Sequence, residues 1–519
     1  MSYKSNPYGG ASVRLGIIIF ITGRGFSAVL TFAAFAMAAR LLNLPEYGIY
    51  AASLALMEIG IALSSVGLDW VAARTLPDYR VYAGGRATVA MILRLGAIQS
   101  FILISVGTLF AVNATHLAEI LQLQDAANAF LLAGVLIAVE GVGRLSRDQM
   151  LGILMHQTAG QLAQLIRSGT LAVLLALALN SGVAHDASDV MRFELIAALS
   201  AGGVGIVLLI HALWRLWPLT PAKSEWRPPA NRRLLKLALH SYTSYLLALA
   251  YGPHVLTILI ARILGVDAVA IFGFARGFAD QVRRYLPTDL LQGVIRPALV
   301  AYYSATNDFS GLMLRLGLWM KSSLIILLPL LAFFCIFGEL GSTALGGEKF
   351  HAAWPVILLL LCVAGMMAWR RVVELASYSV MASDVCVRAG VVLVLMLPII
   401  AGVLLLAESL LLAVALVVTA EAIFCFRVLL MLRQRGFSYT FQKGGFMRLL
   451  FTLILSIALL WLIRDLFEPQ LMVAVMATLL VCSLSMRFIR PFNRDEDALV
   501  ADWSPRLAKL LGCSARVVA

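Results

Sequence analysis

Residues 15–39 read LGIIIFITGRGFSAVLTFAAFAMAA, an apolar run that one charge, Arg24, interrupts. A helix needs about 20 apolar residues to cross a bilayer, so this run predicts a membrane-spanning helix. The run is too long for the core of a signal peptide, and no small-residue cleavage site follows it. We therefore expect it to remain in the protein as the first span.

Similar runs recur along the chain, and the composition agrees with them. Of the 519 residues, 61% are hydrophobic and 13% are charged, whereas soluble domains average about 45–50% apolar and about 25% charged residues. We predict an all-α polytopic membrane protein of about 14 transmembrane helices. The expected spans are 15–39, 49–73, 87–112, 128–148, 154–180, 191–214, 236–263, 268–301, 313–337, 353–379, 387–407, 409–431, 446–464 and 470–489.

Basic residues alternate between the loops. The loops after the second, fourth and sixth spans are rich in Lys and Arg, whereas residues 113–125 and 180–189 contain neither. Cytoplasmic loops carry the excess of Lys and Arg, so both termini are predicted to be cytoplasmic. The net charge of +13 then reflects orientation in the membrane and gives no reason to expect nucleic acid. The six cysteines are scattered singly, which predicts neither a disulfide framework nor a metal site, and no cofactor is expected.

An internal repeat relates two parts of the chain. Residues 39–42 (ARLL) end the first span and residues 261–264 (ARIL) end the seventh, in the same register that pairs Glu58 with Asp280 and Arg74 with Arg296. Copies with the same topology are parallel repeats, and such halves typically enclose a substrate path. The predicted organisation is an N-terminal six-helix lobe (1–217), a cytoplasmic linker (218–233), a C-terminal six-helix lobe (234–435), two additional spans (436–490) and a cytoplasmic tail (491–519).

Two segments resemble a known family. They are residues 39–50 (ARLLNLPEYGIY) and Gly67-Leu68-Asp69 followed by residues 74–77 (RTLP). Both resemble the bacterial polysaccharide (O-antigen and exopolysaccharide) flippases of the multidrug/oligosaccharidyl-lipid/polysaccharide exporter superfamily. That family usually has Gly-Pro where this chain has Asn43-Leu44, a departure that affects a loop turn. The match is strong over the first loop and the second span and weaker to about residue 435.

The resemblance implies a flippase of the bacterial cytoplasmic (inner) membrane. It would move an undecaprenyl-diphosphate-linked oligosaccharide to the periplasmic leaflet by alternating access, for polysaccharide biosynthesis. The implied fold has two six-helix lobes around a central cavity, with the last two spans as an extra pair. The implied partners are the lipid-linked oligosaccharide, membrane lipids and the polysaccharide polymerase machinery.

Polar residues at membrane depth are the candidate site residues. A charge at the centre of a spanning helix costs about 2.5–3.5 kcal/mol on insertion scales, so it should face a cavity or a partner. Arginine binds diphosphate well because its planar fork donates two parallel hydrogen bonds. The predicted substrate-binding residues are Arg24, Gln161, Gln164, Arg167, Arg276, Arg283 and Arg284, and those predicted for ion coupling are Glu58, Asp69 and Asp280.

Several alternatives stay open from the sequence. Glu58 fits a buried ion pair between helices as well as a lumen role, and Arg144 and Arg147 are expected to snorkel towards the cytoplasm. A cation-coupled drug exporter on the same scaffold is the second functional hypothesis. An integral-membrane polymerase is less favoured because the chain has no long outer loop, and no catalytic constellation indicates an enzyme. The tail from Phe492 is expected to be dispensable for transport.

Overall fold

The computed structural model describes residues 10–220, 230–437, 443–464, 470–493 and 496–497. All regular structure within them is helical, and thirteen of their helices are long and apolar enough to cross a membrane. The predicted all-α, multi-pass membrane fold is therefore confirmed. Contacts divide the chain into an N-terminal unit, Met1–Gly273, and a C-terminal unit, Phe274–Ala519.

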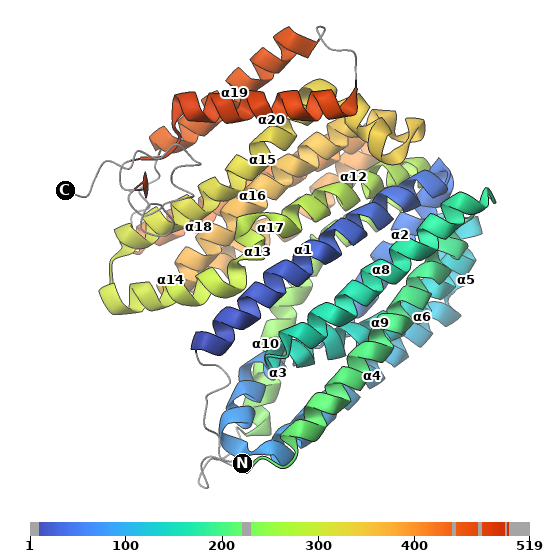
Figure 1. The fold of residues 1–519 in the computed structure, drawn as a ribbon, viewed down its shortest axis with the longest axis vertical. Coiled ribbons are helices and arrows are strands. Elements are labelled where there is room, and N and C mark those ends of the chain that lie inside the picture. Colours follow the sequence, from blue (N-terminus) through green and yellow to red (C-terminus); the bar gives the residue numbers. More distant parts are fainter. Residues whose placement is uncertain (1–9, 221–229, 438–442, 465–469, 494–495, 498–519) are drawn as a thin grey trace. The chain divides into compact units, whose positions relative to one another are not determined.

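In the N-terminal unit, α1 packs along α8, and α6 packs against α2, α4 and α9 (Figure 1). Small residues allow this close packing: a Cβ on Gly134 of α6 would lie 2.5 Å from the backbone nitrogen of Ala111 on α4. The helices are α1 (Gly10–Leu41), α2 (Leu44–Leu63), α3 (Leu68–Asp78), α4 (Gly85–Val112), α5 (Ala114–Leu121), α6 (Ala127–Arg144), α7 (Leu151–Ile153), α8 (Gln157–Ser181), α9 (Ala187–Leu216), α10 (Asn231–Ala250) and α11 (Pro253–Leu264).

In the C-terminal unit, α16 packs against α15 and α18, and α19 and α20 pack against α15. Leu328 and Ala332 of α15 share an apolar cluster with Leu449, Leu460 and Cys482, which attaches the last two spans to this unit. The helices are α12 (Val266–Tyr285), which starts at the end of the first unit, α13 (Pro287–Leu290), α14 (Gln292–Thr306), α15 (Phe309–Gly346), α16 (Trp354–Ser379), α17 (Ser383–Ala407), α18 (Leu410–Gln434), α19 (Lys443–Ile463) and α20 (Leu471–Ile489).

Three of the predicted spans are not continuous helices. The second is broken between α2 and α3, the seventh between α10 and α11, and the eighth between α12 and α13. Each break holds a helix breaker that the sequence displays: Gly67, Gly252-Pro253 and Pro287. Proline lacks the amide proton that a helix interior needs, and Gly67 adopts a φ of 74°, which other residues rarely do. These three predicted spans are therefore interrupted helices.

The broken second and eighth spans keep the register of the internal repeat. The interval from Leu44 to Val266, where α2 and α12 begin, is 222 residues, and so is the interval from Leu63 to Tyr285, where they end. Gly273 of α12 packs on Ala51 of α2, where an added Cβ would overlap that of Ala51, and this interval is again 222 residues. The helix boundaries therefore follow the same repeat that the sequence shows.

The predicted domain boundaries remain a prediction. Contacts place α10 and α11 with the N-terminal unit, since α10 packs on α3 and α11 on α2, whereas the repeat counts them with the second lobe. Much of the predicted linker, residues 221–229, lies outside the described residues. So does the tail beyond residue 497.

The start of the C-terminal tail is anchored in the C-terminal unit. Nζ of Lys321, on α15, donates to both carboxylate oxygens of Glu496 at 2.7 Å, and neither side chain is exposed to solvent. Gly445 of α19 makes room, because a Cβ there would overlap Nζ of Lys321. The dispensability of the tail for transport stays a prediction, and Glu496 is a tail residue with a buried structural contact.

We expect Gly85→Ala to lower the midpoint of thermal unfolding in detergent. Gly85 starts α4 against the end of α9, and its Cβ would overlap the backbone carbonyl oxygen of Leu216, which cannot move aside alone. Gly96→Ala on the same helix is the matched control, since nothing lies within 4 Å of its Cβ. Equal midpoints for the two variants would contradict this packing.

We also expect Glu496→Ala to destabilise the protein strongly, because Lys321 would keep a buried charge without its carboxylate; breaking a buried pair costs about 3–5 kcal/mol. The double variant Lys321→Met with Glu496→Ala should recover most of the loss, since it removes both charges. Thermal unfolding of the three proteins measures this. A single variant as stable as the wild type would show that the pair does not hold the tail.

Candidate functional site

A network of buried charges lies within the N-terminal unit. Arg144 of α6 donates two hydrogen bonds to Glu58 of α2, at 2.8 and 2.6 Å. This bidentate arrangement is the strongest geometry for an arginine and a carboxylate. The ion pair that the sequence left open for Glu58 is therefore present.

Glu140 of α6 is the centre of the network and only 1% exposed. Its Oε1 accepts from Nε of Arg144 at 2.8 Å and from Nη2 of Arg147 at 3.3 Å. Its Oε2 accepts from Nε of Arg167, on α8, at 3.1 Å. One carboxylate thus joins three arginines from two spanning helices and the turn that follows α6.

The network continues to α9 and back to α2. Nη2 of Arg167 donates to Oε2 of Glu194 at 3.0 Å, and the hydroxyl of Tyr50 donates to Oε1 of Glu194 at 2.9 Å. Arg167 was predicted to bind substrate, and the structure places its guanidinium between two glutamates. The helices α2, α6, α8 and α9 are therefore cross-linked by charge.

Two sequence interpretations change here. Arg147 is 3% exposed and Arg144 is bound to two glutamates, so the expectation that they snorkel was wrong. Glu194 was missed altogether. It is an acid within an apolar run, and the cost of such a charge is the signal that could have identified it as half of a buried pair.

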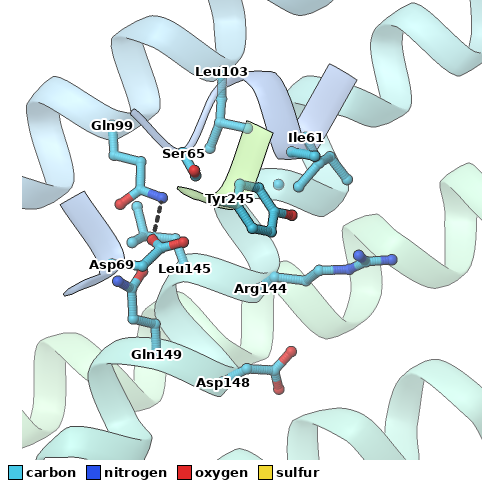
Figure 2. Close-up of a pocket in the computed structure, with 12 residues that line it drawn as sticks. Ile61, Ser65, Asp69, Gln99, Leu103, Arg144, Leu145, Asp148, Gln149 and Tyr245 are labelled. Carbon is cyan, nitrogen blue, oxygen red and sulfur yellow. Dashed lines mark hydrogen bonds between the residues drawn. The ribbon is translucent and has the colours of Figure 1, made fainter. Parts of the chain in front are cut away.

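A cavity of about 400 Å³ opens beside this network, and Figure 2 shows its polar lining. It lies at the break between α2 and α3 and is also lined by α4, α6, the π-helical segment Leu145–Met150 and α10. Its lining residues are Ile61, Ala62, Ser65, Asp69, Gln99, Leu103, Gly141, Arg144, Leu145, Asp148, Gln149 and Tyr245. Of the predicted site residues, Asp69 is the one in this lining.

At the break that shapes the cavity, side chains donate hydrogen bonds to backbone carbonyl oxygens at the end of α2. The Tyr242 hydroxyl of α10 donates to the carbonyl oxygen of Leu63 at 2.8 Å, and the Ser64 hydroxyl donates to that of Gly60 at 2.7 Å. Val66 adopts a φ of 44°, in the left-handed region that a β-branched residue avoids. Such strain costs on the order of 1–3 kcal/mol and gathers at functional sites.

The predicted residues of α1 and α8 lie close together. A Cβ on Gly23 of α1 would lie 2.8 Å from the Cβ of Gln161 on α8, next to Arg24 in the chain. Arg24, Gln161 and Gln164 are all partly buried. These three residues stay candidates for a shared polar surface on α1 and α8.

In the C-terminal unit, Asp280 of α12 lies between two arginines of its own helix. Its Oδ1 is 3.3 Å from Nη2 of Arg283, and its Oδ2 is 4.0 Å from Nε of Arg276. Arg283 also donates to the thioether sulfur of Met367, at 3.3 Å. Arg284 is exposed, because consecutive helical residues point about 100° apart. The two neighbouring arginines therefore have different surroundings.

A second ion network lies on α16. Arg370 donates to Glu374 at 2.8 Å and to Glu421 of α18 at 3.1 Å. Arg371 donates to Asp289 of α13 at 3.3 Å. The sequence analysis did not single out Glu421. Like Glu194 on α9, it binds an arginine from a neighbouring helix. Each unit thus carries an arginine that a glutamate on a neighbouring spanning helix neutralises.

No family model matches the sequence, and no curated protein does. Solved structures do match the fold. The lipid II flippase MurJ in an inward closed conformation has a TM-score of 0.61 at 12% identity, over 90% of this chain and 98% of that one. The chain therefore has a MurJ-like fold.

Two MATE structures agree with that fold. The MATE multidrug transporter DinF-BH has a TM-score of 0.53 at 13% identity, over 85% of this chain and 99% of that one. An inward-facing multidrug resistance MATE transporter of the MOP superfamily has a TM-score of 0.50 at 14% identity, over 81% and 98%. At these identities the likeness concerns the fold alone and does not select between the substrates of the neighbours.

We expect Glu140→Ala to lower the unfolding midpoint in detergent more than any surface variant. Three arginines would lose a shared carboxylate in a buried site, where breaking a pair costs about 3–5 kcal/mol. Asp78→Ala is the control, because its partner Arg74 is 70% exposed and surface pairs contribute about 0–1 kcal/mol. Similar midpoints for both variants would mean that the network adds little to stability.

Proposed function

We propose that this chain is a flippase of the bacterial cytoplasmic membrane, with both termini in the cytoplasm. Its substrate is an undecaprenyl-diphosphate-linked oligosaccharide for polysaccharide biosynthesis. The sequence resemblance to polysaccharide flippases motivates this substrate, and a lipid II flippase among the fold neighbours is compatible with it. The activity is transport without covalent chemistry.

The observation that carries the proposal is the loose pairing of Arg283. Arg144, Arg167 and Arg370 each contact two glutamates, with a shortest distance of 2.6–3.0 Å. Among the described residues, the one acid within ion-pair distance of Arg283 is Asp280, at 3.3 Å, and its other contact is a thioether, which is a weak acceptor. A diphosphate would offer this guanidinium stronger acceptors than it has.

Coupling follows from competition for that guanidinium. When a diphosphate binds Arg283, Asp280 loses a cationic partner, and a coupling metal cation can take that place beside its carboxylate oxygens. When the substrate leaves, Arg283 returns to Asp280 and the cation is released. Glu58, by contrast, is held by a bidentate arginine, so Asp280 is the better placed of the two for ion coupling.

The broken spans fit a transport role. Discontinuous helices in transporters place polar groups near the middle of the membrane, and repeated halves rock around that site. α12 and α13 break directly after the Arg283 region, and α2 and α3 break at the equivalent position of the repeat. We therefore propose alternating access as the transport cycle, with polysaccharide polymerase machinery as the partner that takes up the product.

A drug exporter on the same fold is the competing function, since the MATE neighbours are multidrug transporters. Cells that express the protein would then expel organic cations such as ethidium, and the loss of the protein would leave polysaccharide export unchanged. That pair of results would reject the flippase.

We expect Arg283→Ala to abolish export of the native host's polysaccharide at normal abundance of the protein in the membrane. Arg283→Lys should retain part of the export, because lysine keeps the charge and loses the bidentate fork. Arg388→Ala is the control: this arginine is 70% exposed on α17 and pairs with Asp384. Normal export by Arg283→Ala would mean that Arg283 does not bind the substrate.

A further inference from the structure

The cavity at the break between α2 and α3 contains an acid, Asp69, that is not part of the ion network. Among the described residues, Asp69 has no ion pair, whereas Glu58, Glu140 and Glu194 each contact an arginine. Nε2 of Gln99 donates to Oδ1 of Asp69 at 2.7 Å, and Gln149 lies on the other side of the carboxylate (Figure 2). One amide therefore holds this acid in place, and a second amide lies beside it.

The polar groups in the cavity have unused hydrogen-bonding capacity. Gln99 is only 7% exposed, and its Oε1 has no hydrogen-bond partner among the described residues. The hydroxyl of Ser65 and the ring of Tyr245 complete the lining. A hydroxyl group both donates and accepts hydrogen bonds. A ligand with several hydroxyl groups could therefore form hydrogen bonds with the carboxylate, both amides and the serine at the same time.

Charge and size narrow the choice of ligand. A diphosphate is disfavoured, because Asp69 and Asp148 are both acids and Arg144 is already bound by Glu58. A directly bound metal cation needs oxygen ligands at about 2.0–2.6 Å. The cavity of about 400 Å³ is much larger than such a cage and lies in the range of small-molecule pockets, roughly 300–1,000 Å³.

We propose that this cavity binds a sugar ring of the transported glycan, with Asp69 and Gln99 holding its hydroxyls and the Tyr245 ring packing against its apolar face. This assignment rests on the proposed function. The two proposals assign different parts of the substrate to different residues. Arg283 in the C-terminal unit binds the diphosphate, and the cavity in the N-terminal unit binds the sugar. Asp69 is then a specificity residue, in place of the ion-coupling role predicted from sequence.

The test is calorimetric titration of the purified full-length protein in detergent. The probe is the oligosaccharide that mild acid releases from the lipid-linked pool of the native host, which carries no diphosphate. The wild type should bind it. Asp69→Asn should weaken binding about 10- to 100-fold, as the loss of a hydrogen bond with a charged group does, and Gln99→Leu about 2- to 10-fold, as the loss of a neutral hydrogen bond does. Asp78→Asn, the same substitution on the same helix, should bind normally.

A second readout reports on the cavity directly. A Ser65→Cys protein should react with a maleimide, and the released oligosaccharide should slow that reaction, while the same label on the wild type gives the background from its own cysteines. Unfolding midpoints of Asp69→Asn and Gln99→Leu equal to the wild type would show that both variants fold.

The outcomes separate this inference from the function. Export that needs Arg283, together with oligosaccharide binding that is unaffected in Asp69→Asn and Gln99→Leu, would overturn the sugar site and leave the flippase standing. If the purified protein binds the oligosaccharide through Asp69 but cells that lack the protein export polysaccharide normally, the sugar site would stand and the flippase would be rejected. Binding of ethidium or sodium that depends on Asp69, with no response to the oligosaccharide, would also overturn the sugar site.

Discussion

The carboxylate of Glu140 accepts hydrogen bonds from arginines on three sides and is almost completely buried. In a membrane no water is available to satisfy such a group, so its position is stable only while all its partners are present. This requirement fixes α6 relative to α8 through Arg167. Arg144 also binds Glu58, which links α6 to α2. Arg167 also binds Glu194, which links α8 to α9. The packing of four spanning helices therefore depends on one connected set of charges.

The same requirement explains where the helices break. Unsatisfied backbone groups at membrane depth cost several kcal/mol each, so a spanning helix can be interrupted only where side chains or other helices take over. Tyr242 and Ser64 do this at the end of α2. In the C-terminal unit, Trp319 of α15 donates to the carbonyl oxygen of Pro287 at 2.9 Å, and the amide of Thr288 donates to Ser323. Both breaks are thus supported by neighbouring helices.

The two units use their charges differently. In the N-terminal unit the arginines of the network are tied to glutamates, and one aspartate, Asp69, accepts a hydrogen bond from the amide of Gln99. In the C-terminal unit Arg283 is the loosely held group, and its acid belongs to the same helix. Tightly paired charges, which both units contain, suit a rigid framework, while loosely held charges suit the binding and release of a substrate. The proposed division between sugar and diphosphate follows this difference.

The sequence by itself determined the fold class and the positions of most spans, because the length and hydropathy of a spanning helix are local properties that the bilayer imposes. It also identified the 222-residue register and the charged residues of the eighth span, and Gly67, Gly252 and Pro287 were visible as breakers. Only the tertiary structure decided the partners: Glu58 with Arg144, Arg167 with Glu194, and Lys321 with Glu496. Pairing depends on which helix faces meet, and residues as far as 175 positions apart are brought together by packing that no local pattern specifies.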